Sequence, residues 1–168
     1  MKRKIYIIII VLTFIVLSIL DYGRKYPIED DLDQIGTCIL SYINRPTIIY
    51  DDIDIKETLD IDNKKYILFT LDNTIGFSEF IKGYNHKYKY YVASHGGSNL
   101  FGGRVYETNK GKYIVIYGKN QGIKYKSVTV TLDNKKYKFE LPQNEYYIIH
   151  YSVPRKTKSP YLEDYIFE

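Results

Sequence analysis

The chain has 168 residues, of which 24 are Lys or Arg and 20 are Asp or Glu, giving a formal net charge of +4. Three basic residues (Lys2, Arg3 and Lys4) stand together at the start, so the rest of the chain is close to neutral and lacks the excess basic charge typical of a nucleic-acid-binding protein. The single cysteine, Cys38, excludes an intramolecular disulfide, and we predict a thiol buried as a small hydrophobic group.

An uncharged run from Ile5 to Leu20 follows the basic start and ends at Asp21. As a helix it would span roughly 24 Å, close to the roughly 30 Å hydrocarbon core of a bilayer. Residues 1–21 are therefore predicted to be a membrane anchor. The positive-inside rule places the N-terminus in the cytoplasm and the residues after Asp21 outside it. A cleaved signal peptide, with secretion of the rest, is the alternative.

Beyond the anchor we expect a short linker at 22–29 and then one domain at 30–168, because about 145 residues suffice for one core. Asp30 or Asp31 is a predicted helix N-cap. Apolar residues at helical spacing then predict one amphipathic helix over 31–43. Asn44-Arg45-Pro46 ends it.

From Thr47 onward the pattern changes to short runs rich in β-branched and aromatic residues, separated by Asp, Asn and Gly. Such spacing predicts an antiparallel meander or sandwich. The expected fold class is therefore mainly β (β-rich α+β), with an N-terminal transmembrane helix and one short amphipathic helix. The expected strands lie at 47–59, 64–71, 75–83, 87–94, 102–108, 112–118, 124–132, 135–141, 145–153 and from Tyr161.

Two turns in this pattern have nearly the same sequence, at 61–66 and 132–137, and predict the same hairpin used twice. The last run stops at Glu168 without a turn or polar tail. We therefore expect either an unusually short final strand or a domain truncated at its C-terminus.

Charge is distributed unevenly along the exported part. Residues 21–62 hold 4 basic and 11 acidic residues, whereas residues 63–168 hold 17 basic and 9 acidic residues. Two interpretations remain open. The two parts neutralise each other when packed, or the basic part faces an anionic wall polymer or lipid headgroups.

Motifs for catalysis or metal binding are incomplete. Ser94-His95-Gly96-Gly97 has the form of an oxyanion-hole loop, but Gly76-Phe77-Ser78 lacks the second Gly of a nucleophile elbow. The three histidines (His86, His95 and His150) have no metal-binding spacing. The acidic run from Asp51 to Asp62 fails the calcium-loop pattern, because Glu57 stands where that loop needs Gly. We predict no catalytic residue, metal or cofactor.

The helix at 31–43, the aromatic strand around Tyr90-Tyr91 and the following Gly96-Gly97 resemble a group of uncharacterised small proteins of low-GC Gram-positive bacteria. These proteins are membrane-anchored or secreted. The resemblance covers most of residues 28–152. It implies one β-rich extracytoplasmic domain and carries no activity.

The function predicted from the sequence is a non-catalytic module at the cell envelope that binds or modulates an envelope protein or anionic wall polymer through a strand edge or an aromatic face. An extracytoplasmic hydrolase with an unrecognised site and a truncated or vestigial product are the alternatives. The predicted contact residues are Lys87, Tyr88, Lys89, Tyr90, Tyr91, Gly96 and Gly97.

Overall fold

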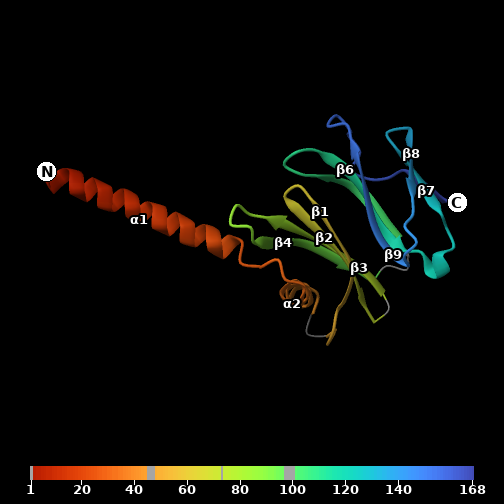
Figure 1. The fold of residues 1–168 in the computed structure, drawn as a ribbon, viewed down its shortest axis with the longest axis horizontal. Coiled ribbons are helices and arrows are strands. Elements are labelled where there is room, and N and C mark those ends of the chain that lie inside the picture. Colours follow the sequence, from red (N-terminus) through yellow and green to blue (C-terminus); the bar gives the residue numbers. More distant parts are fainter. Residues whose placement is uncertain (1, 45–47, 73, 97–100) are drawn as a thin grey trace.

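The computed structural model describes residues 2–44, 48–72, 74–96 and 101–168. An apolar helix precedes a body made of one short helix and three antiparallel sheets, with strand outweighing helix. Figure 1 shows the first helix projecting away from this body, and the C-terminus lying at the opposite end of the molecule. The predicted mainly β fold class is confirmed.

The first helix, α1 (Lys2–Lys25), exposes its large apolar side chains from Ile5 to Leu20. It is long and apolar enough to cross a membrane or to serve as a signal sequence. The helix also continues through Tyr22 to Lys25, so the first part of the expected linker is helical.

The second helix, α2 (Leu32–Ile43), begins and ends where the sequence predicts. The carboxylate of Asp31 caps it by accepting a hydrogen bond of 2.9 Å from the backbone N–H of Gln34. Ile35 and Ile39 are fully buried against the first sheet, because they lie on the same face of the helix.

The first sheet is a meander of β1 (Asp54–Ile61), β2 (Lys64–Leu71), β3 (Thr74–Lys82) and β4 (Tyr88–His95). The first strand is expected to begin at Thr47, but it begins at Asp54, and the described residues 48–53 are not part of it. Instead, the side chain of Asn44 accepts from the N–H of Tyr50 (2.9 Å) and donates to its carbonyl (3.0 Å). These backbone groups are therefore not used in a strand ladder.

The second sheet has the order β5-β6-β9, and its strands are β5 (Phe101–Glu107), β6 (Lys112–Lys119) and β9 (Tyr146–Val153). The third sheet has the order β10-β7-β8, with β7 (Ser127–Leu132), β8 (Lys135–Glu140) and β10 (Asp164–Phe167). A short 3₁₀ turn at Gln121–Ile123 precedes β7. Beyond β4 the chain is thus no simple meander, because β9 returns to pair with β6 and β10 returns to pair with β7.

Two hairpins of the same length occur where the repeat predicts them, but their second turn residues differ, because Asn134 has a positive φ of 59° and Asn63 does not. Both turns close at the same register, at the pairs Ile61–Lys64 and Leu132–Lys135. Asp62 and Asp133 take the same turn position with positive φ angles of 55° and 48°. Asp and Asn tolerate this conformation better than other non-glycine residues do.

The elements stack in four layers: α2, the first sheet, the second sheet and the third sheet. Ile67 and Phe69 of β2 pack toward α2, whereas Tyr66 packs toward the second sheet. In β6, Val115 packs toward the first sheet, whereas Ile114 and Ile116 pack toward the third. Because β2 and β6 are covered on both faces, their apolar runs are nearly continuous instead of alternating.

Candidate functional site

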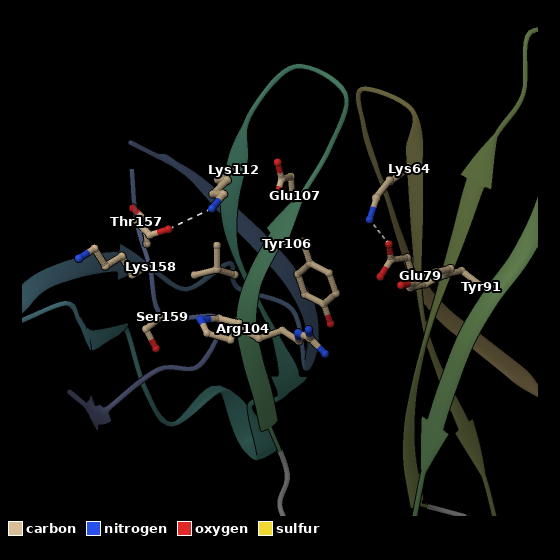
Figure 2. A pocket seen from close by; sticks show the side chains of 12 residues that line it. Lys64, Glu79, Tyr91, Arg104, Tyr106, Glu107, Lys112, Thr157, Lys158 and Ser159 are labelled. Atoms are coloured by element: carbon tan, nitrogen blue, oxygen red, sulfur yellow. Dashed lines mark hydrogen bonds and ion pairs between the residues drawn. The ribbon is translucent and has the colours of Figure 1, made fainter. Parts of the chain in front are cut away.

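A cleft of about 290 Å³ opens where the first sheet meets the second sheet, and we call it the inter-sheet cleft. One wall comes from β2, β3 and β4, and the other comes from β5, β6 and the loop at 154–160 (Figure 2). The side chains that carry its charge and aromatic surface are Lys64, Glu79, Tyr91, Arg104, Tyr106, Glu107, Lys112 and Lys158.

The first-sheet wall is built around a buried ion pair. Glu79 on β3 is 2% exposed, and its carboxylate pairs with the ammonium group of Lys64 on β2. The Lys64 Nζ also lies 5.5 Å from the centre of the Tyr91 ring. A register shift in β4 leaves Tyr91 without a partner residue on β3 and 59% exposed at the cleft.

The second-sheet wall carries an arginine over aromatic rings. The guanidinium carbon of Arg104 lies 5.2 Å from the Tyr106 ring centre and 5.8 Å from that of Tyr161. Cation–π contacts of this kind hold a guanidinium in place without neutralising it. No described carboxylate forms an ion pair with Arg104, and Figure 2 shows its guanidinium extending toward the first-sheet wall.

Bonds from three directions hold the rim at 154–160. The Asp133 carboxylate accepts from the backbone N–H groups of Lys158 (3.1 Å) and Ser159 (3.3 Å). The ammonium of Lys112 donates to the carbonyl of Thr157 (3.0 Å), and the N–H of Val105 donates to that of Pro160 (2.9 Å). The backbone of the rim, which includes Lys158, is therefore fixed where it lines the cleft.

The charge of the cleft is positive. Because Lys64 and Glu79 neutralise each other, Arg104, Lys112 and Lys158 face a single further carboxylate, that of Glu107. None of these three cations forms an ion pair with any residue that the structure describes. Clefts with one sign of charge focus the electrostatic field and attract ligands of the opposite sign.

Elsewhere, the acidic and basic parts of the chain do neutralise each other. Lys65 pairs with Asp30 at 3.2 Å and with Asp60 at 2.6 Å. Lys87 pairs with Glu29 at 2.5 Å. The acidic segment thus pairs with lysines of the basic part, as the first interpretation expects. An anionic polymer or lipid partner for the basic part stays a prediction.

The aromatic residues beneath the cleft are neutral. Tyr66 and Tyr106 contact each other edge to face, with ring centres 5.0 Å apart. Burial raises the pKa of both hydroxyl groups well above the ordinary tyrosine value, so neither acts as a base near neutral pH. The cleft therefore presents a ligand with cationic groups next to aromatic rings, as at Arg104 and Tyr106.

The predicted contact residues on β4 do not form one face. Tyr88 is 1% exposed, and Tyr90 stacks on Tyr42 of α2 with ring centres 3.8 Å apart. Lys87 lies in the β3–β4 turn, and Lys89 lies over the Tyr26 ring at 5.2 Å. Only Tyr91 among the predicted strand residues lines the cleft.

Gly96 is exposed and has a positive φ of 83°, whereas Gly97 lies outside the described residues. The Ser78 hydroxyl is fully buried and donates to the carbonyl of Val92 at 2.9 Å, so this serine is unsuited to be a nucleophile. Across the part of the chain that the structure describes, no three His, Cys, Asp or Glu side chains converge as metal ligands do.

Sequence reasoning missed Arg104, Lys112 and the role of Lys158 in the cleft. The only signal for them was the basic, proline-bounded loop at 154–160. Arg104 and Lys112 stand in ordinary strand patterns, and they meet that loop only because Lys112 pairs with Val153 and Arg104 forms a β-bridge with Tyr161.

Comparison with protein-family models, with curated proteins and with solved structures gives no match. The resemblance to small envelope proteins therefore stays a prediction.

Proposed function

We propose that this chain is a single-pass membrane protein of the cell envelope whose extracytoplasmic part binds an anionic partner without catalysing a reaction. The inter-sheet cleft carries this proposal, because Arg104, Lys112 and Lys158 have no ion-pair partner among the described residues. An anionic wall polymer, with negative groups repeated along a flexible chain, is the partner class that fits best.

The proposed topology is supported by the start of the chain. Lys2, Arg3 and Lys4 precede the apolar run, and such residues are retained in the cytoplasm. The body that follows α1 is then translocated. Cleavage of α1 as a signal peptide would release the same body as a secreted protein.

The cleft favours a charged and partly carbohydrate ligand. Arg104 and Lys112 supply positive charge on the second-sheet wall, and the exposed Tyr91 ring on the first-sheet wall offers an apolar face against which a sugar ring packs. Binding of this kind is screened by salt, so we expect the affinity to fall as ionic strength rises.

Binding of purified wall polymer to the full-length chain in nanodiscs tests the proposal. Replacing Arg104 and Lys158 together by Gln should weaken binding by roughly tenfold, because about 1.4 kcal/mol of charge attraction is lost. Lys124 and Lys126 provide the matched control, since both are exposed and lie outside the cleft lining. Their replacement by Gln removes the same charge and should leave the affinity nearly unchanged. Equal losses in both variants would contradict binding at the cleft.

The hydrolase alternative has one observation in its favour, since Glu79 and Glu107 both line the cleft. Glu79, however, is buried and paired with Lys64. Release of polymer fragments during the binding assay, abolished by Glu79→Gln, would establish hydrolysis in place of binding. Deletion of the protein without any envelope phenotype would favour the vestigial alternative.

A further inference from the structure

The β3–β4 turn, at residues 83–87, is tied directly to the C-terminal end of α1. The backbone N–H of Tyr84 donates to the Tyr22 hydroxyl at 2.8 Å, and the two rings stack with centres 6.3 Å apart. The Asn85 side-chain amide donates to the carbonyl of Tyr26 at 3.1 Å. Ile28 then pairs with Tyr88 as a β-bridge. In Figure 1 this turn is the part of the body that reaches back toward α1.

These bonds fix the height of the turn relative to a membrane that α1 spans. Tyr22 is two residues beyond Leu20, the last residue of the apolar run. At about 1.5 Å per residue, its Cα lies roughly 3 Å above the end of that run along the helix axis. A turn hydrogen-bonded to Tyr22 is thus at the level of the lipid headgroups.

The surface at this level has the chemistry of a membrane interface. The Tyr84 side chain, which is large and largely apolar, is 95% exposed. Tyr22 and Tyr26 stack beside it with ring centres 4.8 Å apart. Tyrosine is enriched at this depth in membrane proteins because its ring is apolar and its hydroxyl is polar.

Basic residues flank the turn and the end of α1. Lys89 lies 5.2 Å from the Tyr26 ring centre, and Lys82 stands at the end of β3 that leads into the turn. Neither lysine, nor the exposed Arg24, pairs with a described carboxylate, whereas Lys25 and Lys87 are paired with Asp21 and Glu29. Uncompensated basic residues near a bilayer are attracted to anionic lipids.

We propose that the β3–β4 turn docks onto the outer surface of the membrane that α1 spans, with Tyr84 inserted among anionic lipid headgroups. The body is then held at one orientation instead of swinging on a flexible linker. The inference rests on the proposed membrane anchor and does not depend on the ligand of the inter-sheet cleft.

The chain contains no tryptophan, so a single introduced tryptophan reports its own depth. Three full-length variants are reconstituted into vesicles of phosphatidylglycerol and phosphatidylcholine that carry brominated acyl chains. Tyr84→Trp tests the docking. Phe14→Trp, within the apolar run, reports insertion of α1. Tyr165→Trp is the matched exposed control on β10, close to the C-terminus at the end opposite α1 (Figure 1).

Docking predicts that the Tyr84→Trp variant loses about half of its emission to bromines placed near the headgroups and shifts to the blue, as interfacial aromatic residues do. The Tyr165→Trp variant should be neither quenched nor shifted. Quenching of the Phe14→Trp variant without quenching of the Tyr84→Trp variant would overturn the docking and leave the anchor intact. Absence of quenching in both would overturn the anchor and the docking together. Polymer binding at the cleft is measured separately and is affected by neither result.

Discussion

Tyr66 and Tyr88 are both buried in the first sheet, but their hydroxyl groups have different surroundings. The Tyr66 hydroxyl has no hydrogen-bond partner among the described residues. The Tyr88 hydroxyl lies 3.3 Å from a carboxylate oxygen of Asp60 and 3.4 Å from one of Asp30. A buried hydroxyl that lacks a partner costs free energy, whereas one that donates to a carboxylate recovers it.

Replacing each tyrosine by phenylalanine separates the two cases. Tyr66→Phe should leave the free energy of unfolding unchanged or raise it by about 1 kcal/mol, because only an unpaired hydroxyl is removed. Tyr88→Phe should lower it by about 1–2 kcal/mol, because the carboxylates lose a donor. Urea unfolding of the solubilised chain measures both. A larger loss for Tyr66→Phe than for Tyr88→Phe would contradict this account.

At the scale of elements, two turns join the first and second sheets. The carboxylate of Asp62, in the β1–β2 turn, accepts from the Thr108 hydroxyl at 2.5 Å. Asn63 accepts from the backbone N–H of Asn109 at 3.0 Å, and Lys110 lies 3.7 Å from Asp62. The hydrogen bond from Thr108 is the largest cause that lowers the pKa of Asp62. These contacts fix the end of the cleft where Lys64 and Lys112 lie.

A lowered carboxyl pKa in the folded state stabilises the fold above the unfolded pKa, and this stabilisation is lost as pH falls through the folded value. Asp62→Asn should therefore lower the free energy of unfolding at pH 7 by about 1 kcal/mol and weaken its decline toward acid pH. Asparagine also tolerates the positive φ of this position. Thermal unfolding at pH 7 and pH 3 measures the effect.

Asp72→Asn is the control for this experiment. Asp72 has a similar φ of 46° in the β2–β3 turn and is exposed, and its carboxylate accepts no hydrogen bond from a described residue. If the Asp72→Asn variant loses as much stability as the Asp62→Asn variant, the loss comes from the turn conformation and not from the contact between the sheets.

At the scale of the whole molecule, the tyrosine-rich core makes the free energy of unfolding decrease at alkaline pH. Burial raises the pKa of Tyr147 to about 12, and it raises the pKa values of Tyr66, Tyr88 and Tyr106 still further. In the unfolded chain these hydroxyls ionise near pH 10. Above that pH the folded state holds protons that the unfolded state has released, so stability falls as pH rises.

We expect a nearly constant urea midpoint between pH 7 and pH 9, followed by a steep decline above pH 10. Each buried tyrosine contributes roughly 1.4 kcal/mol per pH unit between its unfolded and folded pKa values. Tyr147→Phe should make the decline shallower, because phenylalanine cannot ionise. A midpoint that stays constant to pH 11 would contradict the burial of these hydroxyls.

Local pattern alone determined the anchor-like run at Ile5–Leu20, the helix capped by Asp31 and nearly every strand after Asp54. The reason is that side-chain periodicity, capping and turn residues act over a few neighbouring positions, and the repeated Asp-Asn turns show this at Asp62 and Asp133. The excess of basic residues after position 62 was also visible in the sequence.

Tertiary structure decided which residues meet. The return of β9 to β6 and of β10 to β7 depends on burying both faces of the second sheet, which no local pattern encodes. That packing brings Arg104, Lys112 and Lys158 together in one cleft, and it divides the aromatic strand so that Tyr88 lies in the core and Tyr91 at the cleft. Likewise, the contact between Tyr22 and Tyr84 joins residues far apart in the chain. Contacts over such separations arise only when whole layers pack, and for this reason the sequence predicted the elements but not the site.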